Sequence, residues 1–280
     1  MPLGLQMGLA GGGGGSIDAD AASYISLLSA QGVTVTGAQT SAIDAFYVTG
    51  KSEGWYSDLK RMYLPIWAAA GPNAIDLIGG TSGTFNGSMT HGSGFVTGDG
   101  SSSYFDVGAT SATMGISTGD AFIMRGIHID GSDNHDACGV AQTSTISALA
   151  MLNFAAGHAS EGHTYFRHPS SAAQVLITGQ GTDYRGIYIG SSTSTTARFL
   201  MRRRSGGTTV VSNTLLSTQT IYNISPYFMG RHLGSGAVNS PTAGSELAWA
   251  LGTGMTEAQA GDFTAALETM WETCTGLTLF

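Results

Sequence analysis

Short runs of alternating apolar and polar residues fill the chain between residues 73 and 251, and they constrain the fold more than any other feature. Alternation with a period of two is typical of strands that bury one face, and the Gly, Ser, Thr and Asn residues between the runs are those that turns require. No helical run interrupts the series. About a dozen short strands without intervening helices predict a mainly β fold, an antiparallel two-sheet sandwich of the jelly-roll type.

The run at 121–130 is the longest of these candidates. It predicts Phe122 and Met124 on one face of a strand, with Ile123 and Ile127 on the other. Further strands are predicted at 74–78, 84–86, 137–142, 148–154, 164–167, 174–178, 184–189, 197–204, 208–212, 227–230 and 246–251.

The stretch 95–108 (FVTGDGSSSYFDVG) predicts a β-hairpin in the centre of the sandwich. Gly98 and Gly100 permit a positive φ, and Asp99 can bond to its own backbone, as turn residues do. After the turn, Tyr104 and Asp106 are expected on one face of a strand, opposite the intervening residues.

Helical spacing appears before the β region and again at the C-terminus. Runs at 16–32, 39–53 and 55–63 predict three helices, the last of them ended by Pro65. A closing helix is predicted from Thr256, whose hydroxyl fits an N-cap. We therefore divide the chain into an apolar, Gly-rich arm (1–15), a small helical head (16–72) and a sandwich with a C-terminal helix (73–280).

The first fifteen residues combine alternating apolar side chains with a run of five glycines. The arm lacks the basic start of a signal peptide, and no run approaches the roughly 18 apolar residues of a membrane span, so no membrane insertion is expected. Two interpretations stay open, a disordered leader and an arm that docks on a neighbouring subunit. The second rests on the alternation, which suits strand addition, of Leu3, Leu5, Met7 and Leu9.

The charge content excludes a nucleic-acid binder. Charged residues make up only 11% of the chain, and the net charge is −8. The basic cluster Arg202, Arg203 and Arg204 is predicted on a strand, where neighbouring residues alternate faces and form no single patch. With 42 glycines and few charges, the surface is expected to be covered by Ser, Thr, Asn and Gly, which suits an exposed extracellular β protein.

One oxygen-rich loop is a candidate metal site. Asp130, Asp133, Asn134 and Asp136 lie within seven residues of each other, and calcium takes six to eight oxygen ligands. The loop lacks the distal Glu of an EF-hand, and the same residue types are common in turns. No other cofactor is expected.

Cys138 and Cys274 are expected to be free thiols, although their spacing in the sequence alone does not exclude a disulfide.

Catalytic motifs are missing from the sequence, so no enzymatic activity is expected. No His-Glu-x-x-His pattern and no nucleophile elbow occur. Glycoside hydrolysis requires two carboxylates on one face, and Glu161 and Glu246 are isolated among the predicted strands.

Sugar binding is a separate hypothesis, because exposed aromatic rings stack on sugar faces. Each candidate taken singly is more typical of a half-buried position in a sheet; the candidates are Tyr104, Tyr184, Tyr188, Tyr222 and Tyr227.

A Gly-rich leader and several segments in a fixed order carry a family resemblance. The segments are residues 42–46 (AIDAF), 51–65 (KSEGWYSDLKRMYLP), 98–108, 227–231 (YFMGR), 254–259 (GMTEAQ) and 263–268 (FTAALE). Together the chain from about residue 16 to 275 resembles the concanavalin A-like, LamG-type jelly-roll proteins of tailed bacteriophages. The resemblance implies a virion structural protein, a fibre, tail-tip or head-decoration component, that forms homo-oligomers and contacts other virion proteins. Members in other settings bind glycans, frequently with calcium.

The first functional hypothesis is therefore a non-enzymatic virion protein anchored by its N-terminal arm and helical head. The alternative is a carbohydrate-binding adhesin that recognises a glycan on the host surface through exposed tyrosines. A polysaccharide depolymerase is the third, and it would require the paired carboxylates that the sequence does not provide.

Overall fold

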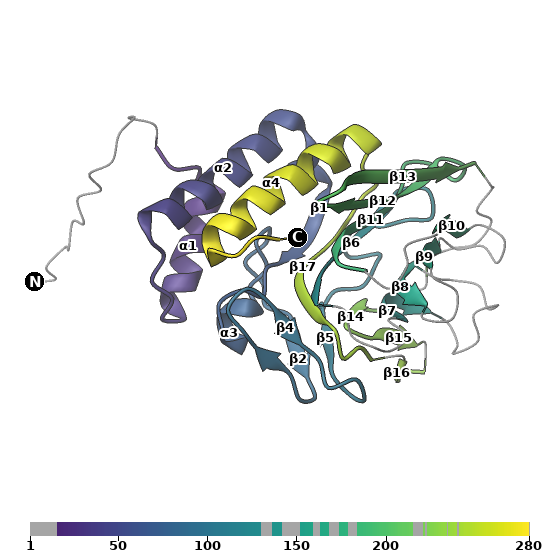
Figure 1. The fold of residues 1–280 in the computed structure, drawn as a ribbon, viewed down its shortest axis with the longest axis horizontal. Helices are drawn as coiled ribbons and strands as arrows, with labels where there is room; N and C mark the ends of the chain where they lie inside the picture. The colour runs from purple at the N-terminus through teal and green to yellow at the C-terminus, as the bar shows by residue number, and fades with distance from the viewer. Residues whose placement is uncertain are drawn as a thin grey trace, which may run out of the picture.

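The structure is a computed structural model of the 280-residue chain, and it describes residues 16–129, 136–141, 152–158, 163–167, 174–178, 184–214, 221, 223–233, 235–239 and 241–279. Two β-sheets pack face to face, and helices cover the outer face of the first sheet (Figure 1). The mainly β, two-sheet fold and the closing helix expected from the sequence are confirmed.

The first sheet is the one next to the helices. Its order is β13-β12-β11-β6-β17-β4-β3, and β1 also pairs with β17. These strands are β1 (Leu59–Tyr63), β3 (Thr90–His91), β4 (Val96–Thr97), β6 (Ala121–Ile129), β11 (Gly186–Ser192), β12 (Arg198–Arg204), β13 (Gly207–Asn213) and β17 (Ser245–Gly252).

The second sheet lies on the far side of the sandwich, in the order β10-β9-β8-β7-β14-β5-β2, with β15 between β7 and β16. The described pairings of both sheets are antiparallel except that of β15 with β7. These strands are β2 (Thr84–Asn86), β5 (Tyr104–Asp106), β7 (Asp136–Ala141), β8 (Leu152–His158), β9 (His163–Arg167), β10 (Gln174–Ile177), β14 (Tyr227–Phe228), β15 (Arg231–Leu233) and β16 (Val238–Asn239).

Three of the helices begin at a side-chain cap. Asp18 caps α1, and the Thr36 and Thr256 hydroxyls accept the N3 backbone N–H of α2 and α4 in capping boxes. Thr256 thus takes the N-cap position predicted for it. The helices are α1 (Ala19–Ala30), α2 (Gly37–Glu53), the 3-10 turn η1 (Trp55–Asp58), α3 (Ala70–Asn73) and α4 (Glu257–Thr275).

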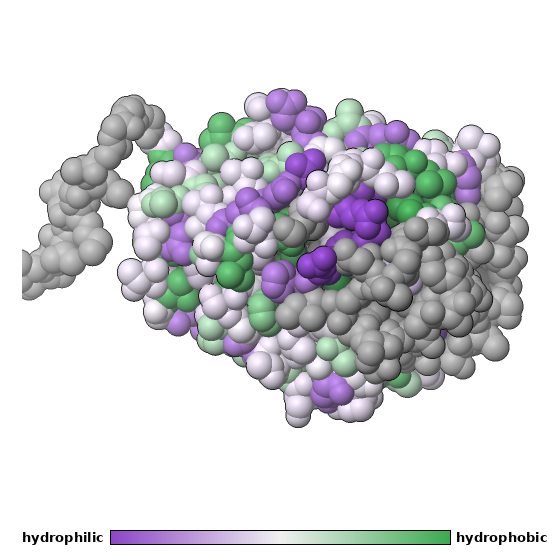
Figure 2. Space-filling model, in the orientation of Figure 1, coloured by the Kyte–Doolittle hydropathy of each residue, from purple (hydrophilic) through white to green (hydrophobic). Residues whose placement is uncertain are grey.

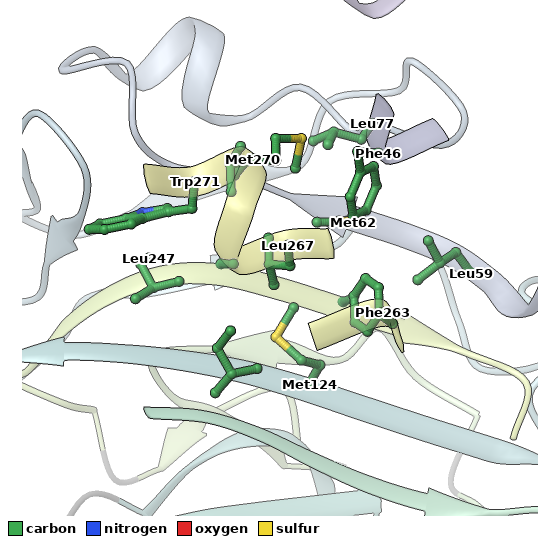
Figure 3. Packing of buried hydrophobic residues seen from close by; sticks show 14 of the residues in the cluster. Phe46, Leu59, Met62, Leu77, Met124, Leu247, Phe263, Leu267, Met270 and Trp271 are labelled. Carbon is green, nitrogen blue, oxygen red and sulfur yellow. The ribbon is translucent and has the colours of Figure 1, made fainter. Parts of the chain in front are cut away.

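One hydrophobic core joins the helices to the first sheet. Figure 3 shows Phe263 and Leu267 of α4 between Met124 of the sheet and Phe46 of α2. Phe263 lies 5.1 Å from Trp55 and 6.4 Å from Phe122, measured between ring centroids. Residues from the predicted helical head and from the predicted sandwich therefore contribute to the same core, and the helices form a third layer on the sheet.

A second core fills the space between the two sheets. Trp249 of β17 stacks on Phe105 of β5 at 4.8 Å and on Phe228 of β14 at 5.5 Å. Ile123 of β6 joins this core, whereas Met124 joins the helical one. The alternation predicted for 121–130 is thus confirmed, and β6 buries both faces because it lies between two apolar layers.

A buried ion pair lies in this second core. Arg125 Nη2 is 2.6 Å from Glu246 Oε1, and the two side chains are 1% and 0% exposed. Trp249 Nε1 donates to the other carboxylate oxygen. Glu246, which the sequence leaves isolated, is therefore engaged on both oxygens, and each charge compensates the desolvation of the other.

Residues 55–63 correct the prediction of a third helix. They form the short turn η1 and then the strand β1, which pairs with β17 from Leu59↔Gly252 to Tyr63↔Trp249. The helical spacing of Leu59 and Met62 is misleading because a bulge next to Leu59 shifts the strand register, so that both side chains reach the helical core. Pairing with a distant strand outweighs weak local helical preference.

The predicted hairpin at 95–108 is also wrong. β4 pairs with β3 and β17 in the first sheet, whereas β5 pairs with β2 and β14 in the second, so the stretch crosses the sandwich. The turn itself is as expected: Asp99 Oδ1 accepts the N–H groups of residues 101, 102 and 103 at 2.8–2.9 Å, and Gly100 has φ +68°. Gly98 has a different role, because a Cβ there would lie 2.2 Å from the Thr242 carbonyl oxygen.

The side chains of Arg202, Arg203 and Arg204 alternate between the two faces of β12, as predicted. Arg202 is buried and lies over the Tyr188 ring, Arg203 pairs with Glu268 of α4 at 2.5 Å, and Arg204 is exposed. The three side chains therefore form no common basic patch. Polar and weakly hydrophobic residues cover most of the described surface on the face in Figure 2.

The two cysteines form no disulfide and lie in different cores, Cys138 between the sheets and Cys274 of α4 in the core that joins the helices to the first sheet. The expectation of buried thiols is confirmed. Among the helices that the structure describes, none has the length and apolar character needed to cross a bilayer.

Candidate functional site

The outer face of the second sheet carries the candidate site. On β5, Phe105 points inward to Trp249, so its neighbours Tyr104 and Asp106 lie on the opposite face. On β14, Phe228 points inward and Tyr227, which pairs with Asp106, lies outward. The helical layer packs on the other sheet, so this face belongs to the side of the sandwich away from the helices (Figure 1).

Three rings form a continuous stack on this face. The ring centroids of Tyr104 and Tyr227 are 4.3 Å apart with an interplanar angle of 23°. Those of Tyr227 and His232 on β15 are 4.0 Å apart with an angle of 4°. Tyr227 is only 6% exposed because it lies between the two other rings, whereas Tyr104 and His232 at the ends are half-buried. We call these three residues the ring stack.

Oriented polar groups border the ring stack. Asp106 Oδ1 accepts the Ser225 hydroxyl and, at 2.8 Å, the Gly108 N–H. His232 Nδ1 lies 2.6 Å from the Ser225 carbonyl oxygen; since that oxygen can only accept, Nδ1 carries the proton. Burial, followed by the charge of Asp106 and then Tyr104, raises the pKa of the Tyr227 phenol above its usual value, so this ring stays neutral.

This arrangement offers the exposed parts of two half-buried rings, Tyr104 and His232, beside the fixed Asp106 carboxylate. Flat rings contact the C–H faces of sugars, while neighbouring oxygens bond to sugar hydroxyls. The structure thus brings together two of the predicted tyrosines, Tyr104 and Tyr227, from strands far apart in the sequence. His232 completes the stack, and sequence reasoning missed it because its strand reaches the site through the parallel pairing with β7.

Two other predicted tyrosines are buried and cannot form an exposed platform. Tyr188 is 0% exposed in the core between the sheets, where its hydroxyl donates to the Tyr184 carbonyl oxygen at 2.8 Å. Tyr184 is 6% exposed. Tyr188 is buried because β11 lies inside the first sheet, where every residue of the strand is buried. Tyr222 lies outside the described residues.

The predicted metal ligands fall mostly outside the described residues. This applies to Asp130, Asp133 and Asn134, while for Asp136 the structure describes only the backbone at the start of β7. Within the described part of the chain, no three His, Cys, Asp or Glu side chains gather as metal ligands. Calcium binding by this loop stays a prediction. The apolar arm residues Leu3, Leu5, Met7 and Leu9 also lie outside the described residues.

The comparisons with known proteins give one structural neighbour of interest. No family model and no curated protein matches the chain. Among solved structures, the chain is similar to domain 4 of AbnA, an extracellular GH43 arabinanase from Geobacillus stearothermophilus, solved in complex with arabinotriose. The match has a TM-score of 0.50 and 12% identity, and it covers 74% of this chain and 98% of the domain. At this identity the similarity shows the β-sandwich fold.

Proposed function

We propose that this chain is a non-enzymatic carbohydrate-binding protein that contacts a glycan through the ring stack. The observation that carries the proposal is the convergence of Tyr104, Tyr227 and His232 on one sheet face, beside the fixed carboxylate of Asp106. Partly exposed aromatic rings are suited to contact with sugar faces, and a carboxylate accepts hydrogen bonds from sugar hydroxyls.

The structural neighbour supports the same class of ligand. Domain 4 of AbnA shares the fold along nearly all of its length and was solved with arabinotriose bound. We therefore choose arabino-oligosaccharides as the first probes for this chain, followed by an array of glycans from bacterial and other cell surfaces.

We propose no hydrolytic role for Glu246 or Asp106, whose carboxylates are engaged by other groups of the protein. Glu246 is held between Arg125 and Trp249 inside the sandwich, and Asp106 is bonded to Ser225 and Gly108. Incubation with each bound polysaccharide is expected to release no reducing sugar above a heat-denatured control. Release above that control would instead favour the depolymerase.

The test compares the full chain with two Tyr→Ala variants. Y104A removes the half-buried end of the ring stack and is expected to weaken glycan binding about 2- to 10-fold in calorimetry, the equivalent of a single aromatic contact. Y56A is the matched control, since Tyr56 is also half-buried but lies in η1, where its hydroxyl donates to Asp20. Equal affinity of Y104A and Y56A, or no glycan binding by the wild-type chain, would overturn the proposal.

A structural role in a phage particle is the second candidate. It rests on the resemblance to tailed-phage jelly-roll proteins and on the alternating apolar residues Leu3, Leu5, Met7 and Leu9 ahead of α1. In this role the arm and the helical layer attach the protein, as a homo-oligomer, to other virion proteins, and the second sheet faces outward. A virion location and the host-adhesin role are compatible with each other.

Deletion of residues 1–15 tests this candidate. We expect the truncated protein to stay folded but to lose co-sedimentation with particles that lack the protein, and light scattering reports whether oligomers persist. Undiminished co-sedimentation of the truncated protein, or failure of the full chain to co-sediment, would contradict the anchoring role.

A further inference from the structure

A cleft of about 650 Å³ is lined by none of the ring stack residues. Its walls come from the loop at 111–119, from residues 194 and 195 between β11 and β12, and from Ile221 and Asn223. This volume lies within the roughly 300–1,000 Å³ of small-molecule sites.

The walls of the cleft are held in place by backbone contacts. The Ala112 N–H donates to Asn223 Oδ1 at 3.0 Å, which fixes the first loop to the segment before β14. Ser194 Oγ accepts the Ala197 N–H at 2.9 Å. Gly119 approaches Thr195 so closely that a Cβ would lie 2.8 Å from the Thr195 backbone nitrogen. A cleft with such fixed walls loses little conformational entropy when it binds a ligand.

The walls of the cleft are uncharged and combine apolar surface with hydrogen-bonding groups. None of the described residues that line the cleft is charged. Ile116 and Ile221 supply an apolar surface, and the hydroxyls of Ser111 and Ser117 and the amide of Asn223 supply hydrogen-bonding groups. This combination fits a compact neutral ring with an apolar face and a hydroxyl-bearing edge, and it disfavours an ionic ligand, whose charge would stay unpaired there.

Ser111 adds a separate observation that points to a ligand. Its side chain is buried, with 2% of the residue exposed, and its Oγ has no hydrogen-bond partner among the described residues. A buried hydroxyl without a partner is unfavourable, and a change of the Ser111 χ1 rotamer is the movement that would bring its Oγ to a ligand in the cleft.

We propose that this cleft binds a neutral sugar or polyol unit, with the Ile116 and Ile221 side chains against its apolar face and Ser111 bonded to one of its hydroxyls. The proposal does not rest on the ring stack. Asn223 accepts the Ala112 N–H in the wall of the cleft, whereas the hydroxyl of Ser225, two residues later, donates to Asp106.

The test is a methyl-labelled NMR titration of the full chain with methyl β-D-galactopyranoside, methyl α-D-glucopyranoside and methyl α-D-mannopyranoside, and with glucuronate as the charged comparison. The δ1-methyl signals of Ile116 and Ile221 are expected to shift in a saturable way with at least one neutral glycoside. Ile43, buried in the helical core, is expected to stay unchanged. Absence of a shift at Ile116 and Ile221 for all three neutral glycosides would overturn the proposal, as would stronger binding of glucuronate.

Two variants with one control separate the cleft from other surfaces. A112W places a large ring at an exposed position of the cleft wall and is expected to abolish the shifts, whereas V48W adds a similar ring on α2 and leaves them unchanged. S111A is expected to weaken binding about 2- to 10-fold without lowering the Tm, because it removes a hydroxyl that has no hydrogen-bond partner among the residues that the structure describes. Retained shifts in A112W would refute the site, and unchanged affinity in S111A would refute the role of Ser111. The Y104A variant is expected to keep this binding, so failure of one site is distinguishable from failure of the other.

Discussion

Truncation of Leu267 to Ala tests whether the helices and the sandwich unfold as one unit. Leu267 is fully buried in the core that joins α4 to the first sheet (Figure 3). Leu→Ala changes at such positions cost about 2.7–5.0 kcal/mol, through lost burial and the cavity left behind. With about 2.1 cal/mol/K of unfolding entropy per residue, 280 residues give ~0.6 kcal/mol/K, so ~3.5 kcal/mol lowers the Tm by ~6 °C.

Differential scanning calorimetry is the assay. We expect one transition in the wild-type chain and one in L267A, shifted as a whole to lower temperature. The matched control is L277A, because Leu277 is 40% exposed and its truncation is expected to cost less than about 1 kcal/mol. Two separate transitions, of which L267A moves only one, would refute the single cooperative unit and favour an independent helical head.

Three further predictions concern buried or bonded groups. R125M removes the ion-pair partner of the buried Glu246 side chain and is expected to lower the free energy of unfolding in urea by about 3–5 kcal/mol; a cost below 1 kcal/mol would contradict the buried pair. Hydrogen bonds from backbone N–H groups, of which that of Ser102 has the largest effect, hold the pKa of Asp99 far below its usual range. The stability that the ionised Asp99 carboxylate contributes is therefore present above about pH 4 and is lost as the pH falls. The gap in urea midpoint between wild type and D99N should therefore narrow on acidification, and a constant gap would refute this role. Burial raises the pKa of Cys274 to about 12, so a disulfide reagent at neutral pH should label it only after denaturation; rapid labelling of Cys274 in the folded protein would show that the thiol is accessible.

The strand pattern was predictable because it depends on local geometry. Alternation in β6 places Ile123 and Met124 on opposite faces whatever the strand pairs with, and this placement is confirmed. The same holds for Tyr104 and Phe105 in β5. The capping box at Thr256 likewise involves only residues of one helical turn.

Pairing between distant strands was not predictable from the same signals. Asp99 and Gly100 form a turn as expected, but Thr97 pairs with Ser245 and Tyr104 with Asn86, so the turn joins two sheets. A turn motif specifies a change of direction and not the partner of the strand that follows. Residues 59–63 are strand for the same reason, since their partner is almost 190 positions away in β17.

In the candidate site, some features follow from local geometry and others from the pairing of distant strands. The outward position of Tyr104 follows from alternation, whereas the burial of Tyr188 follows from the neighbours of β11 and from the layers on both of its faces. His232 meets Tyr227 only because β15 runs parallel to β7, and no local pattern indicates this contact. Exposure of an aromatic residue in a three-layer fold thus depends on which sheet contains it.

A crystal structure of the full chain with the glycan that binds most tightly in the array is the most direct test of carbohydrate binding at the ring stack. We predict a sugar ring in contact with the exposed part of Tyr104 or His232 and a sugar hydroxyl within hydrogen-bond distance of Asp106. A glycan bound elsewhere with the ring stack free, or no glycan that binds at all, would contradict it.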